Sequence, residues 1–186
     1  MKRAVFLDRD GTIVEDLDFL TDLADLRLLP GSAQAIRQLN EGGFLAFVAT
    51  NQSGVARGFL TEKTLRQIHD KLASMLFAEG ARVDGFYYCP HHPTIGPPEY
   101  RKDCPCRKPK PGLFLQAAKD HGVDLSQSFG VGDSVRDAEA ARAAGAAAVL
   151  VRTGPGSEAA ERSGFPFRLV ADDLAAAARG ILSWKP

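Results

Sequence analysis

Short apolar runs alternate with helical patterns along this chain of 186 residues. Residues 4–7 form a continuous apolar run closed by polar residues, which is typical of a strand buried on both faces of a parallel sheet. A helical pattern follows Pro30-Gly31-Ser32 and ends at Gly42-Gly43, and residues 44–49 form the next apolar run. Because strands that alternate with helices pair in parallel, this order predicts an α/β fold with a doubly wound, Rossmann-like parallel sheet.

The alternation continues along the chain with one interruption, at residues 89–110. Thr61 is placed to cap a helix whose apolar residues recur at helical spacing, and Asp172 or Asp173 is placed to cap a final helix. We expect segment 153–165, which is rich in Gly, Pro, Ser and Glu, to be a mobile surface loop. No domain-scale linker is seen, so residues 1–186 are predicted to form a single domain. The remaining predicted strands are 83–88, 129–132 and 146–151, and the remaining helices are 113–121 and 135–144.

The charge balance excludes two classes of partner. Lys plus Arg and Asp plus Glu each number 23, so the chain has no bulk charge with which to hold nucleic acid or an anionic membrane.

No apolar stretch approaches the roughly 20 residues of a membrane-spanning helix. The apolar run at residues 4–7 is also shorter than the roughly 7–15 residues of a secretory signal core, so we expect a cytoplasmic protein. Any acidic ligand must be held by a local site.

Polar residues follow the predicted strands at three places. The first strand ends in two carboxylates, the second in hydroxyl and amide groups that can bind a phosphate, and the fourth in two further carboxylates. Of the last two, Asp133 is suited to bind a metal and Asp137 to brace it. These segments are Asp8-Arg9-Asp10-Gly11-Thr12, Thr50-Asn51-Gln52-Ser53-Gly54 and Gly132-Asp133-Ser134-Val135-Arg136-Asp137.

Each segment also has an ordinary structural explanation. The first is readable as a polar loop cap, the second as a turn and the third as a helix cap, and Lys108 alone would be a surface cation. The carboxyl ends of parallel strands, however, meet at one edge of a sheet, where ligands bind in folds of this class. Together, the segments therefore predict one shared site.

Three cysteines and a histidine lie in the proline-rich insert at residues 89–110. Cys89-Pro90-His91 and Cys104-Pro105-Cys106 are two pairs of metal ligands whose side chains point the same way in extended chain. Two such pairs can form a Cys₃His tetrahedron, which is a structural zinc site with no open position. The alternatives are three buried or reactive thiols, and His92 in place of His91 as the histidine ligand.

These motifs together resemble those of the haloacid dehalogenase superfamily of phosphotransferases. The DxDGT signature stands at residues 8–12 and is followed by Thr50, Lys108 and Gly132-Asp133 in the family's order. The resemblance implies that Asp8 is the nucleophile that forms an aspartyl phosphate and that Asp10 is the general acid and base. It further implies that Mg²⁺ is held by Asp8, Asp133 and the backbone carbonyl of Asp10. Thr50 and Lys108 would stabilise the transferring phosphoryl group.

The CxH…CxCRKP pattern is similar to that of a zinc-containing subgroup without a large cap domain. This subgroup acts on heptose bisphosphates or on histidinol phosphate, and residues 51–58 favour the heptose enzymes. Ser53 and Arg57 suit a sugar bisphosphate, with Arg57 for a second phosphate, and Arg107 is a candidate for substrate recognition. Residues 16–19 depart from the Asp-x-Gly-Tyr of many heptose enzymes and should border the substrate. The implied substrate-binding residues are Asn51, Gln52, Ser53, Arg57, Arg107 and Ser134.

We therefore expect a phosphatase that depends on Mg²⁺, holds a structural Zn²⁺ and acts on a small phosphosugar. We expect neither nucleic acid nor a membrane as a partner. The small capless domain is compatible with a monomer. An alternative of a different class is a non-catalytic zinc-binding interaction module. The complete set of Asp8, Asp10, Thr50, Lys108 and Asp133 argues against that alternative, because an idle site does not require all five.

Overall fold

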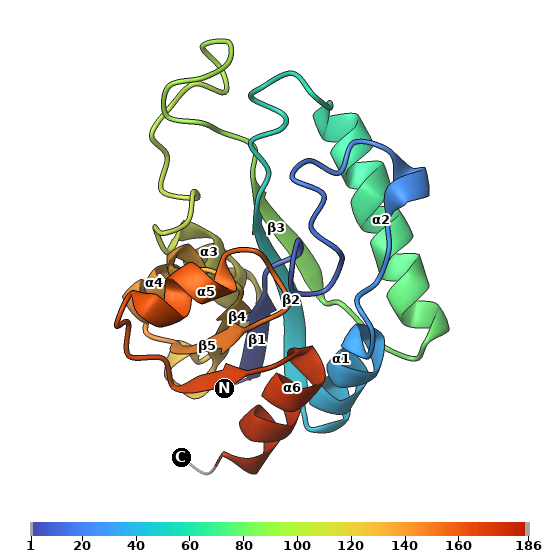
Figure 1. Ribbon diagram of the computed structural model, residues 1–186, viewed down its shortest axis with the longest axis vertical. Coiled ribbons are helices and arrows are strands. Elements are labelled where there is room, and N and C mark those ends of the chain that lie inside the picture. The colour runs from blue at the N-terminus through green and yellow to red at the C-terminus, as the bar shows by residue number, and fades with distance from the viewer. Residues whose placement is uncertain (1, 185–186) are drawn as a thin grey trace.

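A parallel sheet of six strands forms the centre of the molecule in the computed structural model, which describes residues 2–184 (Figure 1). The strand order is β3-β2-β1-β4-β5-β6, and every neighbouring pair is parallel. The predicted doubly wound parallel sheet is thus confirmed. The strands are β1 (Arg3–Leu7), β2 (Phe44–Asn51), β3 (Gly85–Cys89), β4 (Phe129–Gly132), β5 (Ala147–Val151) and β6 (Leu169–Ala171).

Helices cover both faces of this sheet. Helices α1 (Ser32–Glu41), α2 (Glu62–Ala78) and α6 (Leu174–Ser183) pack on one face, and α3 (Gly112–His121) and α4 (Val135–Ala144) pack on the other (Figure 1). The short helix α5 (Ser157–Arg162) follows β5, and two 3₁₀ turns lie at Leu23–Asp25 and Leu125–Gln127. Among the described residues, no helix is both long and apolar enough to cross a membrane.

Two hydrophobic cores result from the alternation of side chains along each strand. In β1, Val5 and Leu7 join the core beneath α1, α2 and α6, whereas Ala4 and Phe6 join the core beneath α3 and α4. The ring of Phe6 lies 4.5 Å from that of Phe114 in α3. Because both faces of the strand are buried from Ala4 to Leu7, these four positions are all apolar. Burial of each large side chain contributes about 1.5–3 kcal/mol to stability.

Capping residues define the helix boundaries much as the sequence predicts. The Thr61 hydroxyl accepts a hydrogen bond from the backbone N–H of Thr64 at the start of α2. Of the two candidates for the last helix, Asp173 is the cap, since its carboxylate accepts from the N–H of Ala176. Helix α3 ends at Gly122, whose φ of 68° is in the left-handed region that glycine adopts without strain.

Segment 153–165 is not the loose surface loop that its composition predicts. It contains α5, whose Ala160 is fully buried, and the chain continues into the unpredicted strand β6. The Thr153 hydroxyl donates to the carbonyl oxygen of Gly11 at 2.6 Å, and the N–H of Gly156 donates to Asp133 at 2.9 Å. Hydrogen bonds to two distant strand ends therefore hold this segment, and composition cannot reveal such bonds.

Candidate active site

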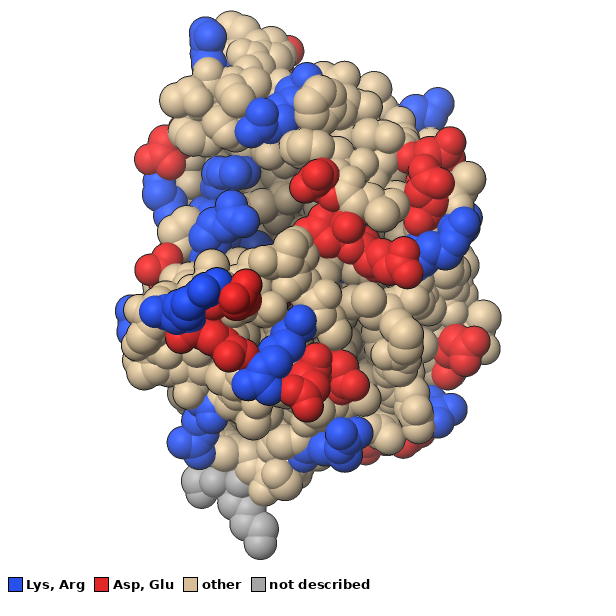
Figure 2. All heavy atoms as spheres, in the orientation of Figure 1, with Lys and Arg blue, Asp and Glu red and all other residues tan. Residues whose placement is uncertain are grey.

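A cavity of about 320 Å³ lies beyond the carboxyl ends of β1, β2 and β4. From β1 the chain adds strands first on one side of the sheet and then, from β4 onward, on the other. Ligands bind at the point between β1 and β4 where this order changes in sheets of this type. Figure 2 shows the hollow, with Lys and Arg gathered on one side and Asp and Glu on the other. The charged residues that line it are Asp8, Asp10, Asp16, Asp18, Arg57, Arg107, Lys108, Asp133, Arg136 and Asp137.

Asp8 is the first residue after β1, and the backbone fixes its position. Its N–H donates to the carbonyl oxygen of Val131 in β4 at 2.9 Å, and its carboxylate accepts from the N–H of Arg9 at 2.7 Å. Burial raises the pKa of Asp8 to about 7, against the lowering effect of Lys108. The neighbouring Asp137 and Asp10 raise the pKa further. The site thus disfavours the charged form of Asp8 unless more positive charge is supplied.

Lys108 is the buried cation of the site, with 3% of its side chain exposed. Its ammonium group lies 3.0 Å from Asp8 Oδ1 and 2.5 Å from Asp137 Oδ1, and it donates to the carbonyl oxygen of Ala49 at 2.7 Å. Burial lowers the pKa of Lys108, but the carboxylates of Asp137 and Asp8 outweigh burial and raise it. The side chain of Asn51 makes two 3.0 Å hydrogen bonds to the Lys108 backbone. Lys108 is therefore charged and firmly placed.

Asp133 and Asp137 complete an acidic cluster with Asp8. Carboxylate oxygens of these three residues lie within 4.8 Å of one another. Burial raises the pKa of Asp133 as well, although the hydrogen bond from Gly156 opposes this. A Cβ atom at Gly154 would lie 2.1 Å from Asp133 Oδ2, so only glycine lets the chain wrap this carboxylate so closely.

The donor set of this cluster fits a magnesium ion. Three carboxylates, those of buried Asp133 and Asp137 and of half-buried Asp8, face a single buried lysine, which leaves uncompensated negative charge. Hard oxygen ligands are those that Mg²⁺ prefers. Asp8 and Asp133, both predicted ligands, are brought together here. The side chain of Asp10 lies outside the cluster. Its predicted contribution through the backbone carbonyl stays a prediction.

Arg9 holds the carboxylate of Asp10 from behind. The Arg9 side chain is 1% exposed, and it donates to both oxygens of Asp10 at 3.0 Å. Gln52 donates to Asp10 Oδ2 at 2.9 Å and to the Thr50 hydroxyl at 3.0 Å, while its own oxygen accepts from Arg9. Gln52, a predicted substrate contact, is buried beside Asp10 and is not among the residues that line the cavity, and its role toward substrate stays a prediction.

His69 of α2 extends this network away from the cavity. Its Nε2 lies 3.5 Å from Nη1 of Arg9, and its ring stacks on Phe86. Burial and the adjacent Arg9 lower the pKa of His69 to about 3, so the ring is neutral and can accept a hydrogen bond from the guanidinium. Arg9 and His69 are absent from the predicted site. The sequence does contain a signal for Arg9, since it is a basic residue between two acidic residues at the end of a buried strand.

The predicted zinc ligands converge in the insert. His91 Nδ1 lies 3.2 Å from the sulfur of Cys104 and 3.4 Å from that of Cys106, and the sulfurs of Cys89 and Cys104 are 3.4 Å apart. All four ligand atoms lie within 4.8 Å of one another. The sulfurs are too far apart for disulfide bonds of about 2.05 Å, and the Cys₃His donor set is one that Zn²⁺ takes in structural sites. The alternative ligand, His92, is not part of this cluster.

The cysteine cluster is connected to the cavity through the backbone. The carbonyl oxygens of Cys89 and Pro90 accept hydrogen bonds from the N–H groups of Gln52 and Ala56 at 2.7 and 3.2 Å. The guanidinium of Arg107, next to Cys106, donates to the carbonyl oxygen of His91 at 3.0 Å. A metal in the cluster would therefore steady Arg107 and the loop that follows β2.

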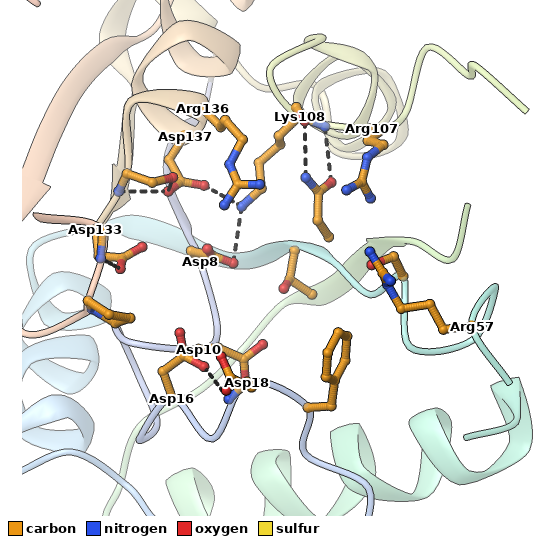
Figure 3. A pocket seen from close by; sticks show the side chains of 17 residues that line it. Asp8, Asp10, Asp16, Asp18, Arg57, Arg107, Lys108, Asp133, Arg136 and Asp137 are labelled. Carbon is orange, nitrogen blue, oxygen red and sulfur yellow. Dashed lines mark hydrogen bonds and ion pairs between the residues drawn. The ribbon is translucent and has the colours of Figure 1, made fainter. Parts of the chain in front are cut away.

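Unpaired arginines form one wall of the cavity. Figure 3 shows Arg107 and Arg136 beside Lys108, Arg57 entering from the adjoining edge next to Arg107, and Asp16 and Asp18 opposite Lys108. Within residues 2–184, none of the three arginines forms an ion pair with a carboxylate. Guanidinium groups without a carboxylate partner fit an anionic ligand.

Comparison with known proteins gives relatives that extend over most of the chain. A D-glycero-beta-D-manno-heptose-1,7-bisphosphate 7-phosphatase of Pasteurella multocida is 45% identical over 155 residues, which cover 83% of this chain and 84% of that protein. The enzyme of the same name from Photorhabdus laumondii is 39% identical, with 96% of both chains covered. The chain belongs to the D-glycero-beta-D-manno-heptose-1,7-bisphosphate 7-phosphatase family.

Solved structures and a sequence family agree with this membership. A D,D-heptose 1,7-bisphosphate phosphatase from B. bronchiseptica, solved with magnesium and phosphate, is 40% identical, with a TM-score of 0.87 and 98% of both chains covered. The corresponding Burkholderia thailandensis enzyme is 32% identical, with a TM-score of 0.72, and the match covers 98% of this chain and 100% of that one. The HAD-hydrolase-like family matches residues 105–177. The resemblance to the haloacid dehalogenase superfamily is thereby confirmed.

Most of the predicted site residues surround the cavity of this family member, and their roles stay predictions. The predicted border at residues 16–19 contributes Asp16, Asp18 and Phe19 to the lining. Asp18 stands at the glycine of the Asp-x-Gly-Tyr pattern and has a φ of 61°, in the region that glycine adopts freely and Asp tolerates. Arg136 lines the cavity without having been predicted. The predicted lining residues are Asp8, Asp10, Thr50, Asn51, Ser53, Arg57, Arg107, Lys108, Asp133 and Ser134.

Proposed function

We propose that this chain is a Mg²⁺-dependent phosphatase that removes the C7 phosphate of D-glycero-D-manno-heptose 1,7-bisphosphate. The observation that carries the proposal is the convergence of Asp8, Lys108 and Asp133 in one cavity, beside arginines with no carboxylate partner. Membership of the heptose bisphosphate phosphatase family supports the choice of substrate.

The residues of the cavity suit a two-step hydrolysis. A carboxylate oxygen of Asp8 attacks phosphorus, and the bond between phosphorus and the sugar oxygen breaks while Asp10 gives that oxygen a proton. Asp10 then takes a proton from water, which attacks the aspartyl phosphate and restores Asp8. Lys108 and Thr50 offset the negative charge of the phosphoryl group throughout. When bound by Asp8, Asp133 and the Asp10 carbonyl, Mg²⁺ supplies further positive charge.

The polarity of the cavity favours a substrate with two phosphates. One phosphate would lie at Asp8 and Lys108, and the other would lie against Arg57 and Arg107. Asp16 and Asp18 on the opposite wall can accept hydrogen bonds from sugar hydroxyls. Histidinol phosphate, the other substrate that the sequence suggests, carries a cationic amine where a bisphosphate carries its second anion. The arginine wall therefore supports the bisphosphate.

The test is a panel of kcat/KM values for both anomers of the heptose bisphosphate, histidinol phosphate and simple sugar phosphates. We expect the bisphosphate to be hydrolysed most efficiently and only in the presence of Mg²⁺. A preference for histidinol phosphate would refute the assignment. Hydrolysis of none of these substrates would favour the non-catalytic interaction module.

We also propose that the enzyme works as a cytoplasmic monomer. Every side chain of the proposed site comes from this one chain, so the chemistry needs no second copy. Size-exclusion chromatography with light scattering should give the mass of one chain at the protein concentration of the assay. A stable dimer under those conditions would contradict this part of the proposal.

Purified protein should contain about one zinc ion per chain. Cys104→Ser should abolish zinc binding, lower the melting temperature and reduce kcat/KM, because Arg107 and the loop after β2 are hydrogen-bonded to the backbone of the cluster. Elemental analysis and thermal unfolding measure both effects. Cys104→Ser protein with unchanged activity and stability would show that the insert needs no metal.

Magnesium binding should be linked to the release of protons. Burial raises the pKa of Asp8 to about 7 and also raises that of Asp133. The folded protein without Mg²⁺ therefore holds protons on these carboxylates. In the unfolded chain the same carboxylates lose their protons near the ordinary aspartate pKa of 3.8. The free energy of unfolding should therefore fall as pH rises from about 4 to 7, by up to about 1.4 kcal/mol per pH unit for each proton.

Urea unfolding at several pH values, with and without added Mg²⁺, measures this linkage. Added Mg²⁺ should remove most of the decline, because the ion favours the charged carboxylates. Gel filtration without chelator removes Mg²⁺ and leaves zinc in place, so the two metals are separated in the experiment. An identical pH dependence with and without Mg²⁺ would contradict the proposed ligands.

A further inference from the structure

His92 carries a proton on Nε2, because its other ring nitrogen is already an acceptor. Nδ1 accepts hydrogen bonds from the backbone N–H of Thr94 at 3.2 Å and of Ile95 at 3.1 Å. The Thr94 hydroxyl, 3.4 Å from Nδ1, can donate to it as well. Because two backbone N–H groups already point at Nδ1, the neutral ring carries its proton on Nε2. His92 therefore presents a hydrogen-bond donor on the side away from its own loop.

This donor faces a second donor. Nε2 of His92 lies 3.3 Å from Nη2 of Arg57, and neither nitrogen can accept a hydrogen bond from the other. Nε of Arg57 is also buried and has no partner among the described residues. Buried donors left unpaired are costly, and two donors side by side are the arrangement expected around the oxygens of an anion.

The position of this donor pair identifies the anion. Arg57 lines the same cavity as Asp8 and Lys108, and Arg107 lies on the same wall (Figure 3). We propose that His92 and Arg57 together bind the phosphate that the enzyme does not remove, which makes His92 a specificity-determining residue. This inference rests on the proposed bisphosphatase function. A phosphate has enough acceptor oxygens for the His92 N–H and for the donors of Arg57 at once.

Two matched variants separate the Nε2 donor from the rest of the ring. In His92→Asn, the side-chain oxygen can accept from the N–H groups of Thr94 and Ile95, as Nδ1 does, but the distal donor is lost. In His92→Gln, the amide places an N–H donor near the position of Nε2. Elemental analysis of both variants verifies that the neighbouring zinc cluster is intact.

The readout is the ratio of kcat/KM for the heptose 1,7-bisphosphate to kcat/KM for the heptose 7-phosphate. We expect His92→Asn to lower this ratio about tenfold, through a higher KM for the bisphosphate, which corresponds to loss of about 1.4 kcal/mol of binding. His92→Gln should restore most of the ratio. A ratio equal to that of the wild type in His92→Asn would overturn the inference, and so would equal losses in the Asn and Gln variants.

The wild-type enzyme distinguishes failure of this inference from failure of the proposed function. If the wild type prefers the bisphosphate and His92→Asn keeps that preference, only the role of His92 is refuted. If the wild type shows no preference for the bisphosphate over the 7-phosphate, the proposed substrate and the second phosphate site are refuted together.

Discussion

Replacing Asp8 with Asn should lower kcat for the heptose bisphosphate by at least about 10⁴-fold. An amide oxygen is a far weaker nucleophile than a carboxylate, and the variant also loses a proposed magnesium ligand. The adjacent carboxylates have contacts of their own: Asp137 pairs with Lys108, Asp10 is held by Arg9 and Gln52, and Asp133 accepts from the N–H of Gly156. Steady-state kinetics measures the loss. Mass spectrometry of acid-quenched wild-type protein should find a phosphorylated peptide that contains Asp8.

Asp70→Asn is the matched control for this variant, since it makes the same chemical change on the exposed side of α2. Its kinetics should equal those of the wild type. Asp8→Asn should keep its zinc and its far-ultraviolet circular dichroism, so that the loss belongs to the chemical step. Residual turnover of Asp8→Asn within about tenfold of the wild type would show that another group is the nucleophile.

Lys108→Met should be the second most damaging change, and it should affect both rate and stability. The methionine fills most of the volume of the lysine but leaves Asp8 and Asp137 without their buried cation. Loss of phosphoryl stabilisation should lower kcat about 10³-fold. In the absence of added Mg²⁺, the free energy of unfolding should fall by about 3 kcal/mol, because breaking a buried ion pair leaves an uncompensated charge.

A double variant separates these two effects. Adding Asp137→Asn to Lys108→Met removes one of the stranded carboxylates, so the double variant should regain part of the lost stability without regaining activity. Urea unfolding and steady-state kinetics on the same preparations test this directly. If the double variant is no more stable than Lys108→Met, the instability does not come from unpaired charge at Asp137.

Most of the strands and helices, and the convergence of the site residues, are predictable because they follow from local rules. Alternating apolar runs predict parallel strands, and parallel strands bring their carboxyl ends together, so Asp8, Thr50 and Asp133 have to meet at one edge. The cysteine cluster is predictable for a similar reason. Its ligands come in two pairs, and a single residue separates the two members of each pair. An extended chain places the side chains of two such residues on the same side.

The sequence does not reveal which side chains support the site from behind. Gln52 lies in a polar segment with neighbours that reach the cavity, and only the backbone path after β2 turns it toward Asp10 and Arg9. Arg9 is buried between two predicted catalytic residues. Its partner His69 belongs to α2, which lies far along the chain, so the sequence does not reveal this contact. Segment 153–165 is similar, since its order depends on contacts to strand ends that are distant in sequence.

The position of β1 between β2 and β4 has a consequence for the chain as it emerges from the ribosome. Asp8 belongs to the first strand, but its proposed metal partner Asp133 and the bracing Asp137 follow the fourth, and the loop that wraps Asp133 comes later still. A nascent chain that exposes only its N-terminal half holds the proposed nucleophile without these partners. On the proposed mechanism, hydrolytic competence therefore requires most of the chain to have been synthesised.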